Sequence, residues 1–111
     1  SKVIPKGSGV KIAAEKSVSP IYTSRSSAHV KPRHVDLNVQ IGRSKFIEGT
    51  NMQNFAQEVV GKGQLTAQKN GLLRYDANLG RVVGTKGQTG GRVILDPKTG
   101  RIITQFPQHM R

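Results

Sequence analysis

The clearest alternation of apolar and polar residues along the chain lies at His34–Ile41, HVDLNVQI. Its apolar residues fall on one side and its polar residues on the other, which is the period of a half-buried β-strand. Residues 1–33 are rich in Ser, Lys, Gly and Pro and show no sustained period, which is typical of an extended segment. The pattern therefore predicts a flexible basic lead-in over residues 1–33 and one compact domain over residues 34–111.

Residues 50–61 have the spacing of an amphipathic helix. Its apolar stripe consists of Met52, Phe55, Ala56, Val59 and Val60. Thr50 fits the N-cap position, with Gln53 three residues on, and Gly61 fits the position that follows a helix. We expect a helix over this stretch, packed on a sheet through the stripe.

After Gly71 the chain predicts short strands separated by turn residues, at positions 72–78, 81–86, 92–96 and 101–106. The segment DPKTG, residues 96–100, predicts a hairpin, because Pro97 presets the first central φ and Gly100 can take a positive φ. A loop of this length pairs Asp96 with Arg101, Ile94 with Ile103 and Arg92 with Gln105, leaving Thr104 on the apolar face. The expected fold class is α+β, with an N-terminal helical and extended part packed on one face of a twisted antiparallel β-sheet.

Charge then narrows the class of partner. The 111 residues include 18 Lys and Arg against six Asp and Glu, a net charge of +12. Lys and Arg that meet phosphates release condensed counterions, so a nucleic acid is the expected partner and an acidic protein the second choice. A membrane-binding helix would need Trp, Phe or Leu opposite its basic face, and the chain has no Trp. No apolar stretch reaches the length of a membrane span, so we expect no membrane insertion.

The residues available for chemistry favour a metal-free reaction. The chain has no Cys, its three His are widely spaced and its carboxylates are few, so we expect no metal and no cofactor. A metal-free ribonuclease uses the 2′-OH of its substrate as the nucleophile, and the protein supplies a base, an acid and groups that bind the phosphate. Groups of these kinds gather on the predicted strands, and for each the alternative is an ordinary solvated residue.

Two segments carry the best candidates. His34 follows the cations Lys31 and Arg33, which favour a lowered pKa and hence a base, although it also fits an exposed residue at the start of a strand. The run GTKGQTGG, residues 84–91, lacks the spacing of a Walker A motif. It is either a flexible connection between strands or a loop that brings Lys86 to a backbone phosphate.

The run Tyr75–Pro107, YDANLGRVVGTKGQTGGRVILDPKTGRIITQFP, resembles the C-terminal sheet of RNase toxin domains from contact-dependent growth inhibition effectors. These domains belong with the barnase, EndoU, tRNase-colicin and RelE group, and the hairpin that ends in GRIITQFP carries the resemblance. It implies metal-independent cleavage of RNA, with tRNA as the substrate, and delivery from the surface of the producer cell into the cytoplasm of a target cell. It also implies a cognate acidic immunity protein and leaves open a host activating factor.

The residues and the resemblance together give a set of site residues. The expected catalytic residues are His34, Tyr75, Lys86, Arg92 and Thr104. The expected RNA-binding residues are Lys31, Arg33, Arg74, Thr85, Arg101 and Gln105. Since the predicted register buries Thr104, either the pairing shifts by one after Ile103 or Gln105 takes the active position. A non-catalytic RNA-binding protein is the alternative function, and a module that binds an acidic protein is a third.

Overall fold

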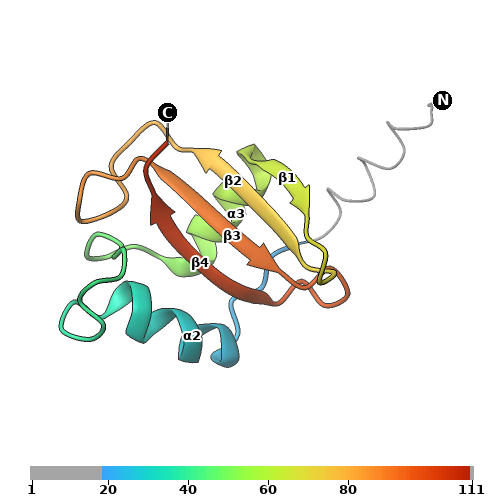
Figure 1. Ribbon diagram of the computed structural model, residues 1–111, viewed down its shortest axis with the longest axis horizontal. Helices are drawn as coiled ribbons and strands as arrows, with labels where there is room; N and C mark the ends of the chain where they lie inside the picture. Colours follow the sequence, from blue (N-terminus) through green and yellow to red (C-terminus); the bar gives the residue numbers. More distant parts are fainter. Residues whose placement is uncertain (1–18, 111) are drawn as a thin grey trace.

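A computed structural model of the chain describes residues 19–110 (Figure 1). In chain order its elements are α2 (Ser24–Val30), the π-helix η1 (Lys31–Val35), α3 (Met52–Lys62), β1 (Gln64–Ala67), β2 (Leu73–Asn78), β3 (Gly90–Leu95) and β4 (Ile102–Gln108). The strands form one sheet in the order β1-β2-β3-β4, and each strand is antiparallel to its neighbours. The α+β class predicted from the sequence is confirmed.

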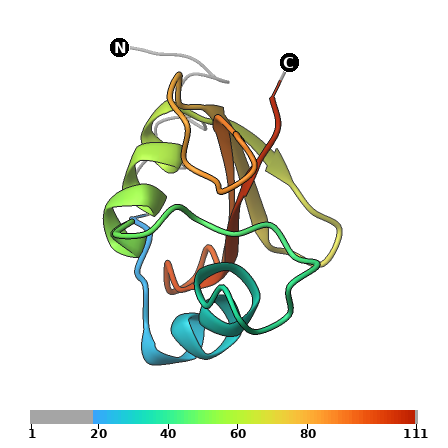
Figure 2. The same cartoon turned by 90° about the vertical axis from the view of Figure 1, so that its left-hand side faces the viewer.

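Helix α3 covers one face of the sheet (Figure 2). It begins after Asn51, whose side chain accepts a hydrogen bond from the backbone N–H of Asn54 at 2.9 Å. Phe55 and Val59 are buried and pack against Gly91 of β3, where a Cβ atom would collide with both side chains. The predicted helix is confirmed, but its N-cap lies one residue later than Thr50 and Gly61 lies inside it.

The core fills the space between α3 and the sheet. Its strand residues include Val93, Leu95 and Ile102, all fully buried. Phe46, from the connection between η1 and α3, packs edge-on against Phe55 with 4.6 Å between the ring centroids. The sheet thus has one covered face, and the side chains that alternate with the core residues lie on the opposite face.

Helix α2 and η1 lie beside β4, at the edge of the sheet (Figures 1 and 2). The Thr23 side chain caps α2, and the Ser26 hydroxyl donates a hydrogen bond to the carbonyl oxygen of Ile102 at 2.5 Å. Val30 is fully buried. The extended conformation predicted before His34 is therefore wrong for residues 24–30. Residues 1–18 of the predicted lead-in lie outside the described residues, and the division into lead-in and domain stays a prediction.

The strand predicted at His34–Ile41 is also wrong. His34 belongs to η1, where the N–H of Asp36 donates to the carbonyl oxygen of Lys31 at 2.8 Å, and the chain then continues as a loop. Leu37, Val39 and Ile41, which would have faced the core, are 52%, 43% and 76% exposed. The segment alternates apolar and polar residues, but it pairs with no strand of the sheet.

The hairpin predicted at DPKTG is confirmed. Gly100 has a φ of +80°, and its N–H donates to the carbonyl oxygen of Asp96 at 2.7 Å. Beyond the turn the register shifts at Ile94 and Leu95, so that Ile94 lies opposite Thr104 and Arg92 opposite Phe106. The predicted pairs of Ile94 with Ile103 and of Arg92 with Gln105 are wrong, and the alternative with a shift of one residue is confirmed.

Two strand predictions need correction. Residues 81–86 form no strand and belong to a loop, in which Gly84 makes an isolated bridge to Phe46. Strand β1 was not predicted, because Gln64–Ala67 is too short and too exposed to show an alternating pattern. The sheet has four strands in spite of both errors.

Candidate nucleic-acid interface

The face of the sheet opposite α3, called the open face below, carries a patch of polar side chains. In the register of the strands, Asp76 of β2 lies opposite Arg92 of β3, which lies opposite Phe106 of β4. In the next row Arg74 lies opposite Ile94, and Ile94 opposite Thr104. The polar members of this patch are Arg74, Asp76, Arg92, Thr104 and Gln108, all of them partly buried. A partly buried group of this kind is positioned by the sheet and still reachable from solvent.

Asp76 is the centre of the charged part of the patch. Its Oδ1 accepts hydrogen bonds from Arg92 Nε at 2.6 Å and from Gln108 Nε2 at 2.8 Å. Arg74 Nε, which is buried, lies 3.1 Å from Oδ2, within ion-pair distance but without hydrogen-bond geometry. Burial alone would raise the pKa of Asp76, but the hydrogen bonds and charges of its partners outweigh burial and lower that pKa. Asp76 is therefore a carboxylate at neutral pH.

His34 reaches the patch from the β4 edge. Its ring is buried and packs on Phe106, with 5.2 Å between the ring centroids. Its Nδ1 lies 2.6 Å from the carbonyl oxygen of Ser44. A carbonyl oxygen only accepts, so Nδ1 carries the proton and Nε2 is the basic nitrogen of the neutral ring.

The pKa of His34 lies below the ordinary value of 6.5, first because burial disfavours the charged ring and then because Lys45 and Arg43 repel it, although the Ser44 carbonyl acts in the opposite direction. The lowered pKa was predicted from the sequence. Its cause was not, because the prediction relied on the charges of Lys31 and Arg33. His34 is neutral at neutral pH, which is the form that accepts a proton.

Phe106 brings the patch and the histidine together. The Arg92 guanidinium carbon lies 5.9 Å from the centroid of the Phe106 ring, and His34 packs on the same ring. Thr104 lies two residues earlier on β4 and therefore on the same face. The structure thus brings together four predicted site residues: His34, Arg74, Arg92 and Thr104.

Sequence reasoning missed Asp76, Phe106 and Gln108. The signal that could have found them is the period of two along a strand, since Asp76 alternates with Arg74, and both Phe106 and Gln108 alternate with Thr104.

Lys45 is a buried cation with a structural role that was not predicted from the sequence. Its ammonium group donates to the carbonyl oxygens of Pro32 at 3.3 Å, Arg33 at 2.6 Å and Val39 at 2.5 Å. These carbonyls belong to η1 and to the loop after it, so Lys45 ties the two together. The residue before it is Ser44, and the anchoring of Lys45 therefore places the Ser44 carbonyl against His34.

The loop at residues 79–89 places Thr85 and Lys86 at the end of the sheet where β2 ends and β3 begins. The N–H of Thr85 donates to the carbonyl oxygen of Lys45 at 2.9 Å, and the N–H of Phe46 donates to that of His34 at 2.8 Å. The side chain of Gln88, which is buried, accepts a hydrogen bond from the backbone N–H of Lys86 at 2.8 Å. Thr85 and Lys86 are exposed on a loop that is linked to the His34 segment through residues 45 and 46.

Two predicted site residues lie in the core instead of on the open face. Tyr75 is 4% exposed, and Gln105 is fully buried, with its Nε2 donating to the carbonyl oxygen of Met52 at 3.1 Å. Both lie on the covered face because each follows an open-face residue along its strand, Arg74 and Thr104 respectively. A bound RNA cannot touch them, and we do not retain them as site residues.

The remaining predicted RNA-binding residues are Arg101, Lys31 and Arg33. Arg101 lies just before β4, at its hairpin end, five residues before Phe106 and thus roughly 16 Å away along the chain. Lys31 is exposed on η1, and Arg33 Nη1 donates to the carbonyl oxygen of His29 at 3.0 Å. Lys31 and Arg33 therefore share η1 with His34, whereas Arg101 lies at the end of β4 away from Phe106.

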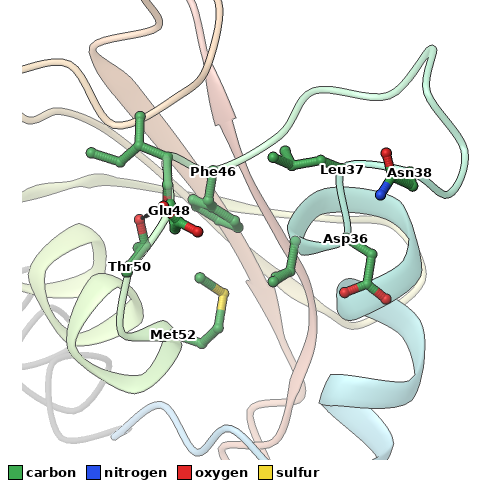
Figure 3. A pocket seen from close by; sticks show the side chains of 10 residues that line it. Asp36, Leu37, Asn38, Phe46, Glu48, Thr50 and Met52 are labelled. Carbon is green, nitrogen blue, oxygen red and sulfur yellow. Dashed lines mark hydrogen bonds between the residues drawn. The ribbon is translucent and has the colours of Figure 1, made fainter.

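A pocket of about 350 Å³ opens between the loop after η1 and the start of α3 (Figure 3). Phe46, Glu48 and Met52 line one side of it, and Leu37 lines the other. Its lining includes two acidic side chains, Asp36 and Glu48, and no Lys or Arg. It contains none of the predicted site residues, and its charge does not suit a nucleic acid.

Within residues 19–110 no three His, Cys, Asp or Glu side chains gather in a way that could hold a metal ion. No helix in that part of the chain has the length and apolar character that crossing a membrane requires. No family model, curated protein or solved structure matches the chain.

Proposed function

We propose that this chain is a metal-independent endoribonuclease that binds RNA on the open face of its sheet. One observation carries the proposal: His34 and Arg92 both pack against the ring of Phe106, and Thr104 lies two residues from Phe106 on the same face of β4. These are a neutral imidazole, a cation and a hydroxyl, which are the groups that cleavage through the 2′-OH requires. The net charge of +12 supports a polyanionic substrate.

In the proposed reaction Nε2 of His34 takes the proton of a ribose 2′-OH. The 2′-oxygen attacks the adjacent phosphorus, the bond from phosphorus to the 5′-oxygen breaks, and the products are a 2′,3′-cyclic phosphate and a 5′-hydroxyl. Arg92 and Arg74 stabilise the charge that builds up on the phosphate oxygens, and the Thr104 hydroxyl donates a hydrogen bond to one of them. Lys86, on the loop linked to the His34 segment, supplies the proton that the leaving 5′-oxygen takes up.

The biological setting follows from the resemblance of Tyr75–Pro107 to toxin RNase domains. We propose tRNA as the substrate, delivery from a producer cell into the cytoplasm of a target cell, and an acidic immunity protein that covers the basic site. The α+β fold with an antiparallel sheet is compatible with the barnase, EndoU, colicin and RelE group. Charge complementarity supports the immunity protein, since the site that it must cover carries Arg74, Arg92 and Lys86.

Non-catalytic RNA binding is the second candidate. The observation that favours it is the burial of His34, which is only 6% exposed and so offers little of its ring to a substrate.

The test that separates the two candidates is incubation of the purified chain with total tRNA in EDTA. The ribonuclease account predicts discrete fragments with 2′,3′-cyclic phosphate ends. If the chain binds tRNA but leaves it intact, the ribonuclease proposal is wrong and non-catalytic RNA binding is the function supported.

A further inference from the structure

Asp76 is the one carboxylate among the described strand residues of the open face, and it lies within a surface that we propose binds RNA. By charge alone it should weaken that binding, since a carboxylate repels phosphates and neutralises the arginines beside it. The way in which the two arginines contact Asp76 points to a different role.

Each of the two arginines approaches the Asp76 carboxylate with its Nε atom. Arg92 Nε lies 2.6 Å from Oδ1 and Arg74 Nε lies 3.1 Å from Oδ2. Nε is the inner nitrogen of a guanidinium group, so the terminal Nη1 and Nη2 atoms remain for another ligand. Among the described residues these terminal nitrogens have no other hydrogen-bond or ion-pair partner.

Asp76 is itself held in place. Gln108 Nε2 donates both to Asp76 Oδ1 at 2.8 Å and to the carbonyl oxygen of Gly91 at 3.1 Å, so it braces the carboxylate against β3. The sheet register places Asp76 directly opposite Arg92 and two residues from Arg74 on the same strand. The carboxylate is therefore fixed between the two guanidinium groups by the backbone and by Gln108.

From this arrangement we infer that Asp76 is a positioning residue: it holds Arg74 and Arg92 as a two-armed clamp whose outer nitrogens bind one phosphate of the RNA backbone. The inference rests on the proposed function and names the phosphate-binding part of that site. A guanidinium group whose Nε is fixed presents its outer edge in one orientation and loses less rotational freedom when it binds a phosphate. Phe106, under the Arg92 guanidinium, restricts that side chain further.

The sign of one mutational effect tests the inference. Binding of a fluorescently labelled single-stranded RNA oligonucleotide is measured by anisotropy in the full chain carrying His34→Gln, so that cleavage does not interfere. We expect Asp76→Ala to raise the Kd about tenfold although it makes the protein more positive, and Asp76→Asn to give a smaller loss. The slope of log Kd against log salt falls by about one, as loss of one phosphate contact requires.

Glu48→Gln is the matched control, because Glu48 is exposed and removal of its charge gives the same change in net charge. We expect this control to bind RNA as tightly as its parent or slightly more tightly. In a background of Arg74→Ala and Arg92→Ala, Asp76→Ala should cause no further loss and should behave like the control, because the residues through which Asp76 acts are gone.

An Asp76→Ala variant that folds, as shown by its thermal melt, and binds RNA as tightly as its parent or more tightly overturns the inference. A further loss in the Arg74→Ala, Arg92→Ala background also overturns it, because the effect would then not pass through the arginines. If Asp76→Ala does not fold, Asp76→Asn decides by the same criterion. If the parent chain itself does not bind RNA, the proposed function is overturned together with the inference. If the parent binds RNA and only the Asp76 variants behave otherwise than expected, the inference alone fails.

Discussion

Nδ1 of His34 donates a hydrogen bond to the carbonyl oxygen of Ser44 across 2.6 Å, and this contact determines which ring nitrogen can act as a base. Lys45 holds the carbonyl in place through its own bonds to residues 32, 33 and 39. The ring packs on Phe106, which also lies beside Arg92. The proposed base and the proposed phosphate-binding arginine are thus positioned by the same aromatic ring.

The lowered pKa of His34 predicts how cleavage depends on pH. Its cause is first burial and then the charges of Lys45 and Arg43, so the ring stays neutral below the ordinary value of 6.5. We expect the pH at which the rate of RNA cleavage is half-maximal to lie below 6.5. A rate that is half-maximal above pH 6.5 in single-turnover assays would contradict this assignment of the base.

The same shift predicts a change in stability. Between the folded-state pKa of His34 and 6.5 the unfolded chain binds more protons than the folded chain, so the free energy of unfolding decreases as the pH falls through this interval. The pKa of His29 is also lowered and contributes with the same sign. Urea melts at pH 7 and pH 5 should show a smaller loss of stability in His34→Gln than in the wild type. Equal losses would show that His34 does not titrate in this way.

Replacement of Lys45 by Met should destabilise the fold. The ammonium group satisfies three buried or partly buried carbonyl oxygens, and loss of a buried hydrogen-bond partner costs about 1–3 kcal/mol. The loop that carries Ser44 also loses its anchor, so cleavage should fall with stability. Lys98→Met, at an exposed position of the hairpin, is the control and should leave the urea midpoint unchanged. A Lys45→Met variant as stable as this control would contradict the role given to Lys45.

The Thr104 hydroxyl is expected to act in cleavage and not in stability. Thr104→Val keeps the shape and the β-branched character that suit a strand but removes the donor. We expect cleavage to slow about tenfold, with a change in unfolding free energy below about 0.5 kcal/mol. Thr66→Val on β1, also on the open face but separated from β4 and Phe106 by two strands, should cleave at the wild-type rate. Equal rates in the two variants would remove Thr104 from the site.

Glu58 and Arg81 form an exposed pair whose contribution to stability should be small. Two bonds of 2.6 Å join them, and, with burial opposing, this contact and the one to Lys62 lower the pKa of Glu58 to about 2. The Arg81 side chain is 57% exposed, so solvent screens the pair and Arg81→Ala should cost less than about 1 kcal/mol. The pKa of Glu58, followed by NMR, should rise toward 4.5 in that variant. An unchanged Glu58 pKa would show that the pair does not form in solution.

The elements predicted correctly from the sequence are those with local determinants. The apolar stripe of α3 and the Pro97 and Gly100 turn each contain their own signal within a few residues. The segment at His34–Ile41 failed because its strand-like alternation competes with tertiary contacts, namely the packing of His34 on Phe106 and the bonds from Lys45 to Arg33 and Val39. The residues of the segment itself do not indicate those tertiary contacts.

Only part of the candidate site could be predicted from the sequence, and the reason is geometric. The expected set contained consecutive strand residues, Arg74 with Tyr75 and Thr104 with Gln105, and neighbours on a strand point to opposite faces. One member of each pair therefore had to be buried, and the shift in register at Ile94 decided in favour of Thr104. That shift has no sequence signal, whereas Asp76 could have been found from its alternation with Arg74.

The central claim is that the open face cuts RNA through His34, and one comparison tests it most directly. The wild type and His34→Gln are measured with the same tRNA in EDTA, for binding and for single-turnover cleavage, with His29→Gln as the control on the preceding helix. The account predicts that His34→Gln binds tRNA within about threefold of the wild type and releases no 2′,3′-cyclic phosphate ends, while His29→Gln cleaves normally. A His34→Gln variant that cleaves tRNA at the wild-type rate would contradict the account.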